Sequence, residues 1–268
     1  MLERVPTCYI FVMAILAVTG VAIPLLIMFF LKKRGVKGSY FFWGFAAAVV
    51  FSLAFEQIIN AVIIYFFGYR IAATTLNKAL YTGFLAALFD EFGKFIFLGK
   101  VIDKKDDNRN AVMFGAGFGM LEMVCLLSCE MISNLMFAIK INNGQFQQMM
   151  EGLDSESTEQ MNTIKFNLCN VGWKTYAAEF AGKLMSFTIQ VCLCVIVWYA
   201  VKLGGMYRLL VILSFALHMG INSGSVYISD CFGGTVAELV FLAFTVVMVV
   251  LTLLLYKKLK DKEPIVEE

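Results

Sequence analysis

Apolar runs long enough to cross a bilayer follow one another along the 268 residues of this chain. A hydrocarbon core about 30 Å thick requires roughly 20 residues of helix. Because lipid offers no hydrogen bonds, a spanning segment must satisfy its own backbone groups, which favours the α-helix. The runs therefore predict an all-α, polytopic transmembrane helical bundle of about seven spans. The expected spans are residues 6–31, 40–67, 79–102, 111–139, 173–201, 207–228 and 234–256.

The composition agrees with this class. The chain is 60% hydrophobic and 16% charged, whereas soluble domains are roughly 25% charged. Its basic residues cluster at the ends of the apolar runs, so the net charge of +2 gives no reason to expect a nucleic-acid partner. The apolar runs themselves predict contact with membrane lipid. No internal repeat or shift in composition divides the sequence. We therefore expect a single integral membrane domain over 1–268.

The distribution of Lys and Arg predicts the orientation in the membrane, because basic loops stay on the cytoplasmic side. Basic residues gather in 32–39, 100–110 and the tail 257–268, which lie on one side if there are seven spans. The longest loop, 140–172, is acidic and should lie outside. Its composition favours a solvated connector, with a surface helix or a cover over the outer mouth as the alternative. We expect the N-terminus outside and the C-terminus in the cytoplasm.

Three spans carry an ionisable residue near their middle: Glu91, Glu122 and His218, the single histidine of the chain. A helical rise of about 1.5 Å per residue puts each roughly 17 Å from its helix end, near the bilayer midplane. A charged carboxylate there costs about 2.5–3.5 kcal/mol, so such residues are candidates for function. Their common depth predicts one polar site between the third, fourth and sixth spans.

Helical spacing adds neighbours to these residues. Lys94 follows Glu91 at i+3, and Asn222 follows His218 at i+4, so each pair shares a helix face. A buried Glu91–Lys94 ion pair that only holds helices together is the alternative for the first pair. Glu179 lies one to two turns inside the fifth span.

Glycines precede Glu122 at positions 115, 117 and 119. Glycines at this spacing let two helix backbones approach closely. No strand precedes them, which argues against a nucleotide-binding loop.

Three motifs follow one another between residues 80 and 225. They are Asp90-Glu91-x-x-Lys94, Gly115-x-Gly117-x-Gly119-x-x-Glu122 and His218-x-x-x-Asn222. In this order they resemble the intramembrane proteases that include the type II CAAX prenyl endopeptidases and bacteriocin-immunity (CPBP) group, the PrsW proteases and the YhfC family. The resemblance is strongest to YhfC, whose later helix carries a glutamate at the place of Glu179. It implies an integral protein of a bacterial plasma membrane.

The resemblance implies hydrolysis of peptide bonds within or at the edge of the membrane, with a membrane protein or peptide as substrate. Glu91 would be the general base that activates water, and Lys94 would hold it in place. His218 and Asn222 would donate hydrogen bonds to the developing oxyanion. Glu122 would orient His218 or bind a metal ion.

The family pattern has histidines at two places where this chain has Phe118 and Phe187. A zinc ion with three protein ligands and a water would therefore use His218, Glu122 and Glu179. Two other function classes stay open. A catalytically inactive relative would bind a membrane partner, as an immunity or regulatory protein does, and the two phenylalanines favour it. A small proton-coupled transporter would use the buried carboxylates as a relay, but the chain lacks an inverted repeat.

Overall fold

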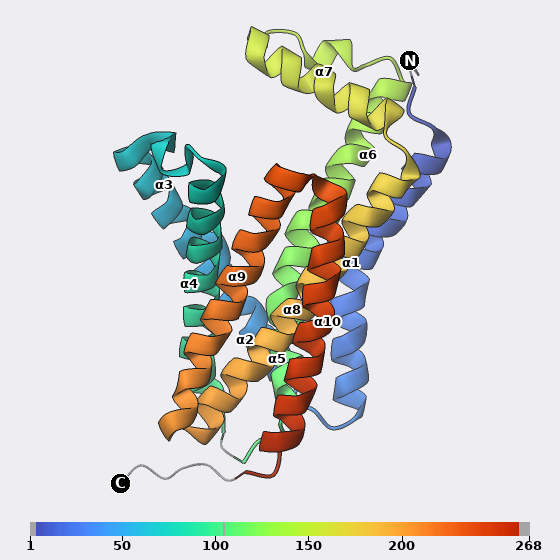
Figure 1. Ribbon diagram of the computed structural model, residues 1–268. Coiled ribbons are helices and arrows are strands. Elements are labelled where there is room, and N and C mark those ends of the chain that lie inside the picture. Colours follow the sequence, from blue (N-terminus) through green and yellow to red (C-terminus); the bar gives the residue numbers. More distant parts are fainter. Residues whose placement is uncertain (1–3, 104, 263–268) are drawn as a thin grey trace. The chain divides into compact units, whose positions relative to one another are not determined.

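The computed structural model describes residues 4–103 and 105–262, and within them every regular element is a helix (Figure 1). The α-helices are α1 Thr7–Lys33, α2 Ser39–Ala48, α3 Glu56–Phe67, α4 Thr75–Val101, α5 Asn110–Met123, α6 Cys129–Asn142, α7 Ser155–Asn170, α8 Trp173–Leu203, α9 Leu209–Phe232 and α10 Gly234–Leu259. Two π-helical segments join consecutive helices, η1 Val49–Phe55 and η3 Val124–Ser128. Short 3₁₀ turns are η2 Gly68–Ala72, η4 Gln147–Met149 and η5 Gly205–Arg208. The all-α prediction is confirmed.

Six helical stretches of the described chain are long and apolar enough to cross a membrane. They are Thr7–Lys33, Ser39–Ala72, Asn110–Asn142, Trp173–Leu203, Gly205–Phe232 and Gly234–Leu259. The seventh expected span is α4, whose 27 residues give about 40 Å at 1.5 Å per residue. It differs from the other six by the charged residues in its middle. The expectation of about seven spans thus corresponds to six apolar helices and one polar one.

Two compact units can be distinguished in the chain, and each is described by itself. The first comprises Met1–Ile23 and Glu122–Leu184. In it, the Asn142 side chain accepts a hydrogen bond from the Val5 backbone N–H at 2.8 Å and donates one to the Val5 carbonyl at 3.0 Å. The single domain expected over 1–268 stays a prediction.

The first unit also contains the whole of the expected outer loop, 140–172. Residues 155–170 form α7, which contacts α6. Asp154 starts this helix by accepting a hydrogen bond from the Ser157 N–H at 2.8 Å, as a helix N-cap does. Residues 155–170 of this stretch are thus helical, and its role as a solvated connector, a surface helix or a cover stays a prediction.

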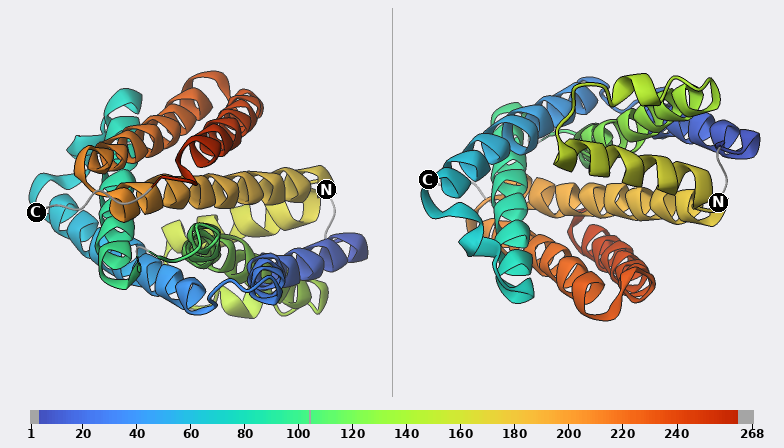
Figure 2. Two further views of the ribbon diagram at one scale, coloured as in Figure 1. Left: turned by 90° about the horizontal axis from the view of Figure 1, so that it is seen from below. Right: turned by 90° about the horizontal axis from the view of Figure 1, so that it is seen from above.

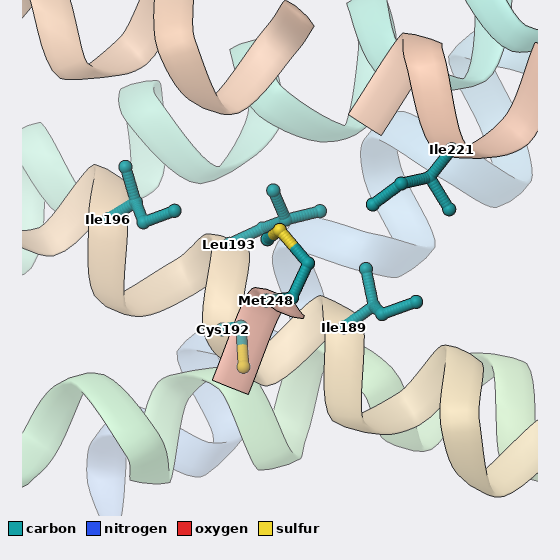
Figure 3. Packing of buried hydrophobic residues seen from close by; sticks show 6 residues of the cluster. All are labelled: Ile189, Cys192, Leu193, Ile196, Ile221 and Met248. Carbon is teal, nitrogen blue, oxygen red and sulfur yellow. The ribbon is translucent and has the colours of Figure 1, made fainter. Parts of the chain in front are cut away.

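The second unit comprises Pro24–Leu121 and Met185–Glu268. In it α4 packs along α9, and α9 runs beside α10, as Figure 2 shows from both ends. Side chains from α8, α9 and α10 form a shared apolar core (Figure 3). The six residues drawn there are Ile189, Cys192, Leu193, Ile196, Ile221 and Met248. This core holds α8 and α9 in place, and both contribute to the polar centre described below.

The glycines before Glu122 pack α5 against two other helices of the second unit. A Cβ at Gly117 would overlap the carbonyl of Phe41 in α2, and one at Gly115 would lie 2.8 Å from the Cα of Val191 in α8. Either contact is too short for a real side chain, so only glycine fits. Close helix packing explains this motif, as expected for small residues in membrane helices.

Large apolar side chains point outward from the last helix. Leu239, Val246 and Leu253 in α10 are 65%, 55% and 56% exposed. In water such a surface would be unfavourable, because apolar area gains free energy when it leaves water. These side chains therefore contact lipid.

The three basic segments of the sequence meet at one end of the second unit. The backbone N–H of Lys37 donates to the Asn110 side chain at 3.0 Å. The Asn108 amide donates to the carbonyl of Lys260 at 3.2 Å. The segments that carry the basic residues thus lie on the same side. Residues 263–268 of the expected cytoplasmic tail lie outside the described residues.

Candidate functional site

The centre of the second unit is polar. Asp90, Glu91 and Lys94 in the middle of α4 are 6%, 2% and 0% exposed, and His218 in α9 is 3% exposed. The burial of charged side chains is costly unless they pair with one another. Here α4 and α9 are the two helices that pack together, so their polar faces meet.

Glu91 accepts hydrogen bonds on both of its oxygens. The Lys94 ammonium donates to Oε1 at 2.6 Å, and Nδ1 of His218 lies 2.8 Å from the same atom. The hydroxyl of Ser214 donates to Oε2 at 2.5 Å. Because an ionised carboxylate only accepts, the proton of the Glu91–His218 bond belongs to Nδ1. Glu91 therefore fixes the tautomer and the orientation of the imidazole.

Asp90 is held from two other helical segments. Ser52 in η1 donates a hydrogen bond to Oδ1, and the side-chain amide of Gln190 in α8 donates to Oδ2 at 2.8 Å. Nε2 of His218 lies 3.8 Å from the same Oδ2, which is too long for a hydrogen bond. The imidazole thus stands between two carboxylates, bonded to Glu91 through Nδ1 and facing Asp90 with Nε2.

Lys94 lies in a complete cage. Besides Glu91, its ammonium donates to Oε1 of Gln190 at 2.7 Å. It also lies 4.6 Å from the centre of the Phe118 ring, where the π face attracts a cation. Gln190 therefore joins the two halves of the centre, since its amide binds Asp90 and its carbonyl binds Lys94.

A pocket of about 720 Å³ lies beside this centre, between α3, α4, α9 and α10. Asn222 lines it, one helical turn after His218. Its other polar lining residues include Glu56, Lys78, Asp230 and Glu238. Lys78 and Asp230, both on its wall, form an ion pair of 2.9 Å. The pocket gives the second unit a space with both polar and apolar walls one helical turn away from the imidazole.

The structure brings together three of the predicted site residues, Glu91, Lys94 and His218. The fourth, Asn222, lies one turn further along α9, on the pocket wall. Glu122 and Glu179 belong to the first unit, so their predicted role beside His218 stays a prediction. One oxygen of Glu179 is buried without a hydrogen-bond partner.

Sequence reasoning missed Ser52, Gln190 and Ser214 as parts of the centre. Ser214 precedes His218 by four residues, and this spacing places both on one face. Gln190 is a polar residue inside the long apolar run of α8, which was a usable signal. Ser52 had none, because serine is common in membrane helices.

The donor set around His218 does not fit a metal ion. A structural or catalytic zinc needs three or four donors that converge on one point. The two imidazole nitrogens face different carboxylates, and the Glu91 oxygen nearest to Nδ1 already binds an ammonium. No three His, Cys, Asp or Glu side chains converge in this way anywhere in the described ranges. The steps proposed below therefore involve no metal.

The fold and the centre together define a class, a polytopic helical membrane protein with a buried carboxylate–histidine pair. Within this class, the chain belongs to the YhfC intramembrane metalloprotease family, whose sequence model matches residues 13–245. It is 23% identical over 186 residues to a Bacillus subtilis (strain 168) protein described as "Uncharacterized membrane protein YhfC". That alignment covers 66% of this chain and 69% of the relative. No solved structure matches.

The resemblance to YhfC is confirmed, while the wider grouping with the CPBP and PrsW proteins stays a prediction.

Proposed function

We propose that the protein is an intramembrane peptidase in which His218 is the general base and Glu91 orients it. The observation that carries this proposal is the position of the imidazole, with Nδ1 bonded to Glu91 and Nε2 left facing Asp90. A carboxylate that holds one imidazole nitrogen while the other accepts a proton is the arrangement found in many hydrolases. We therefore assign the role of general base to His218 and not to Glu91, because both oxygens of Glu91 already accept hydrogen bonds within the protein.

The charge balance of the centre supports this role. Asp90 and Glu91 contribute two negative charges and Lys94 one positive charge. A neutral His218 leaves one negative charge unbalanced in a buried site. When Nε2 takes a proton from a water molecule, the imidazolium lies between the two carboxylates, and the unbalanced negative charge passes to the hydroxide that attacks the substrate. The proton transfer that activates the water is therefore stabilised by the residues around it.

The remaining steps follow from the position of the pocket. A peptide bond in the pocket would meet the activated water beside His218. The side-chain amide of Asn222 would donate a hydrogen bond to the oxyanion of the tetrahedral intermediate. The imidazolium would then return its proton to the leaving amine. The substrate class is a membrane protein or a membrane-bound peptide.

Cleavage of single-span peptides in proteoliposomes, read by mass spectrometry, tests the proposal. His218→Gln should lower the rate about 10²- to 10⁴-fold, which is the usual contribution of a general base. Glu130→Gln is the matched control, because Glu130 is an exposed glutamate of α6, and it should retain the rate of the parent. Full activity of the His218 variant would overturn the assignment.

A catalytically inactive, partner-binding protein is the second candidate. It is favoured by the hydrogen bonds of the centre, since Asp90, Glu91 and Lys94 all find their partners within the protein. On this proposal the wild type cleaves no peptide in the panel, whereas a membrane protein co-purifies with it and is lost with the pocket variant Asn222→Leu. Cleavage that depends on His218 would exclude it.

We also infer the orientation from the basic end of the second unit. Its three basic segments would face the cytoplasm, with the C-terminus on that side and the N-terminus outside. Labelling of single cysteines by a membrane-impermeant reagent in intact cells tests this. A cysteine in place of Glu156 in α7 should react and one in place of Lys105 should not, and the reverse pattern would overturn the orientation.

A further inference from the structure

The Lys94 ammonium has the surroundings of a bound cation. It is completely buried, with a carboxylate oxygen at 2.6 Å, an amide oxygen at 2.7 Å and the Phe118 ring at 4.6 Å. Oxygen ligands and a π face are the groups that hold small cations in proteins. Here the cation is covalently part of the chain.

The same ammonium uses the atoms that a divalent ion would need. Glu91 Oε1 binds both Lys94 and Nδ1 of His218, so it is the one atom of the centre with a carboxylate, an imidazole and a cation in contact. A second cation at this oxygen would be repelled by the ammonium in a site that excludes water. It would also displace the proton that Nδ1 donates to Glu91.

We propose that Lys94 is the resident cation of this centre, so that the protein binds no divalent metal there, although its family is named for metalloproteases. The residue acts by position, since it neutralises one of two buried carboxylates and holds Glu91 and Gln190 at their places. The proposal deepens the metal-free peptidase proposed above, but its measurement is metal binding and not cleavage.

The proposal predicts that the variant Lys94→Ala gains the ability to bind a metal ion. Lys94→Ala leaves two buried carboxylates without a balancing charge, and it vacates the position between Glu91 Oε1 and Gln190 Oε1. His218 Nδ1 lies 2.8 Å from the first of these oxygens, and it would become a ligand once a metal ion displaced the proton that it donates to Glu91. One carboxylate, one imidazole and one amide oxygen form a ligand set that accepts Co²⁺ or Zn²⁺. Removal of the lysine should therefore create a metal site.

The experiment is a Co²⁺ titration of the detergent-purified full chain after treatment with EDTA. Co²⁺ is chosen because its visible absorption reports ligands directly. The wild type and Lys94→Arg, which keeps the positive charge, should show no binding that depends on His218. Lys94→Ala should bind about one ion per chain, and the additional change His218→Ala should abolish this. The His218→Ala single variant corrects for ions bound by exposed cysteines, of which Cys8, Cys129 and Cys231 are three.

Two results would overturn the proposal. One is a stoichiometric metal in the wild type that disappears in His218→Ala. The other is a folded Lys94→Ala protein that binds no ion at all. If Lys94→Ala does not fold, the wild type and Lys94→Arg decide alone, and His218-dependent binding in either would overturn the proposal.

The peptidase proposal is tested separately, by peptide cleavage. It fails if peptides are not cleaved, whatever the metal titration shows.

Discussion

Two polar networks of the second unit use similar parts in different ways. One is the buried centre of Asp90, Glu91, Lys94 and His218. The other, at the basic end of the unit, is built around Asp106, whose carboxylate accepts hydrogen bonds from Lys37 at 2.5 Å and from the hydroxyl of Tyr40. The Lys37 side chain is 58% exposed, whereas that of Lys94 is 0% exposed.

The main difference between the two networks lies in the groups to which their side chains are hydrogen-bonded. At the basic end, side chains bind the backbone of the loops, since Lys202 donates to the carbonyl of Asp106 at 2.5 Å and Tyr40 reaches the carbonyl of Val101 at 3.1 Å. In the part of the chain that the structure describes, the buried centre connects side chains with one another, from η1, α4, α5, α8 and α9. The first arrangement closes loops and stabilises the fold. The second leaves one nitrogen of a titratable group without a hydrogen bond, which is what acid–base chemistry requires.

The largest decrease in the free energy of unfolding is expected from Glu91→Ala. It removes the carboxylate that pairs with Lys94 and leaves a buried ammonium, and such a loss costs about 3–5 kcal/mol. Reversible unfolding in mixtures of SDS and a mild detergent measures this as a lower free energy of unfolding. The double variant Glu91→Ala with Lys94→Met should regain much of the loss, because the ammonium is removed together with its partner and Asp90 keeps its hydrogen bonds from Ser52 and Gln190. If the double variant were less stable than Glu91→Ala, the ion pair would not be the cause.

The next decrease in the free energy of unfolding is expected from Phe118→Leu. The ring contributes a cation–π contact of about 0.5–2 kcal/mol to Lys94, in addition to its packing. Phe187→Leu is the matched control, because Phe187 is a second buried phenylalanine, which packs on Gly119. The difference between the two free energies of unfolding isolates the ammonium contact. This difference should vanish when Phe118→Leu and Phe187→Leu are each introduced separately into the Lys94→Met variant.

These buried contacts show how much the sequence can predict. Glu91, Lys94 and His218 could be placed together because their helical depth agrees and their spacing puts them on defined faces. Gln190 stands out as a polar residue in an apolar run, but it could not be placed at this centre, since the sequence does not tell which face of α8 meets α4. The packing of α8 decides this, through Gly115 and the apolar core around Leu193. The end of the fold with basic residues was predictable from charge, but the hydrogen bonds of Asp106 to the loops were not.

A further loss of stability is expected from Asp106→Ala at the basic end. It removes the acceptor of Lys37 and Tyr40, and the loss of such hydrogen bonds costs about 1–3 kcal/mol. The polar centre should be unaffected, so peptide cleavage, if present, should keep its rate at temperatures where the variant is folded. Asp103→Ala is the control from the same loop. A cleavage rate that falls with Asp106→Ala would mean that the two networks are coupled.

The smallest expected effect is the pH dependence of the stability that Asp106 contributes at the basic end of the second unit. Burial raises the pKa of Asp106, but the hydrogen bonds from Lys37 and Tyr40 outweigh it and hold the pKa below its ordinary value of 3.8. The hydrogen bond with Asp106 likewise raises the pKa of Lys37 above 10.5, against a smaller opposite effect of burial. The folded state therefore binds a proton at Asp106 less readily than the unfolded state. Its stabilisation is complete well above the unfolded pKa of 3.8 and is lost progressively, from about pH 5 downward, as the pH falls through the lower, folded value.

Unfolding measured between pH 7 and pH 3 tests this. The stability of the wild type should change little because of Asp106 down to about pH 5, and should then fall more steeply than that of Asp106→Asn. The asparagine keeps the shape of the side chain but has no proton to gain. Curves of equal slope for the two proteins would show that the acid sensitivity lies elsewhere, and the buried carboxylates of α4 would be the next groups to vary.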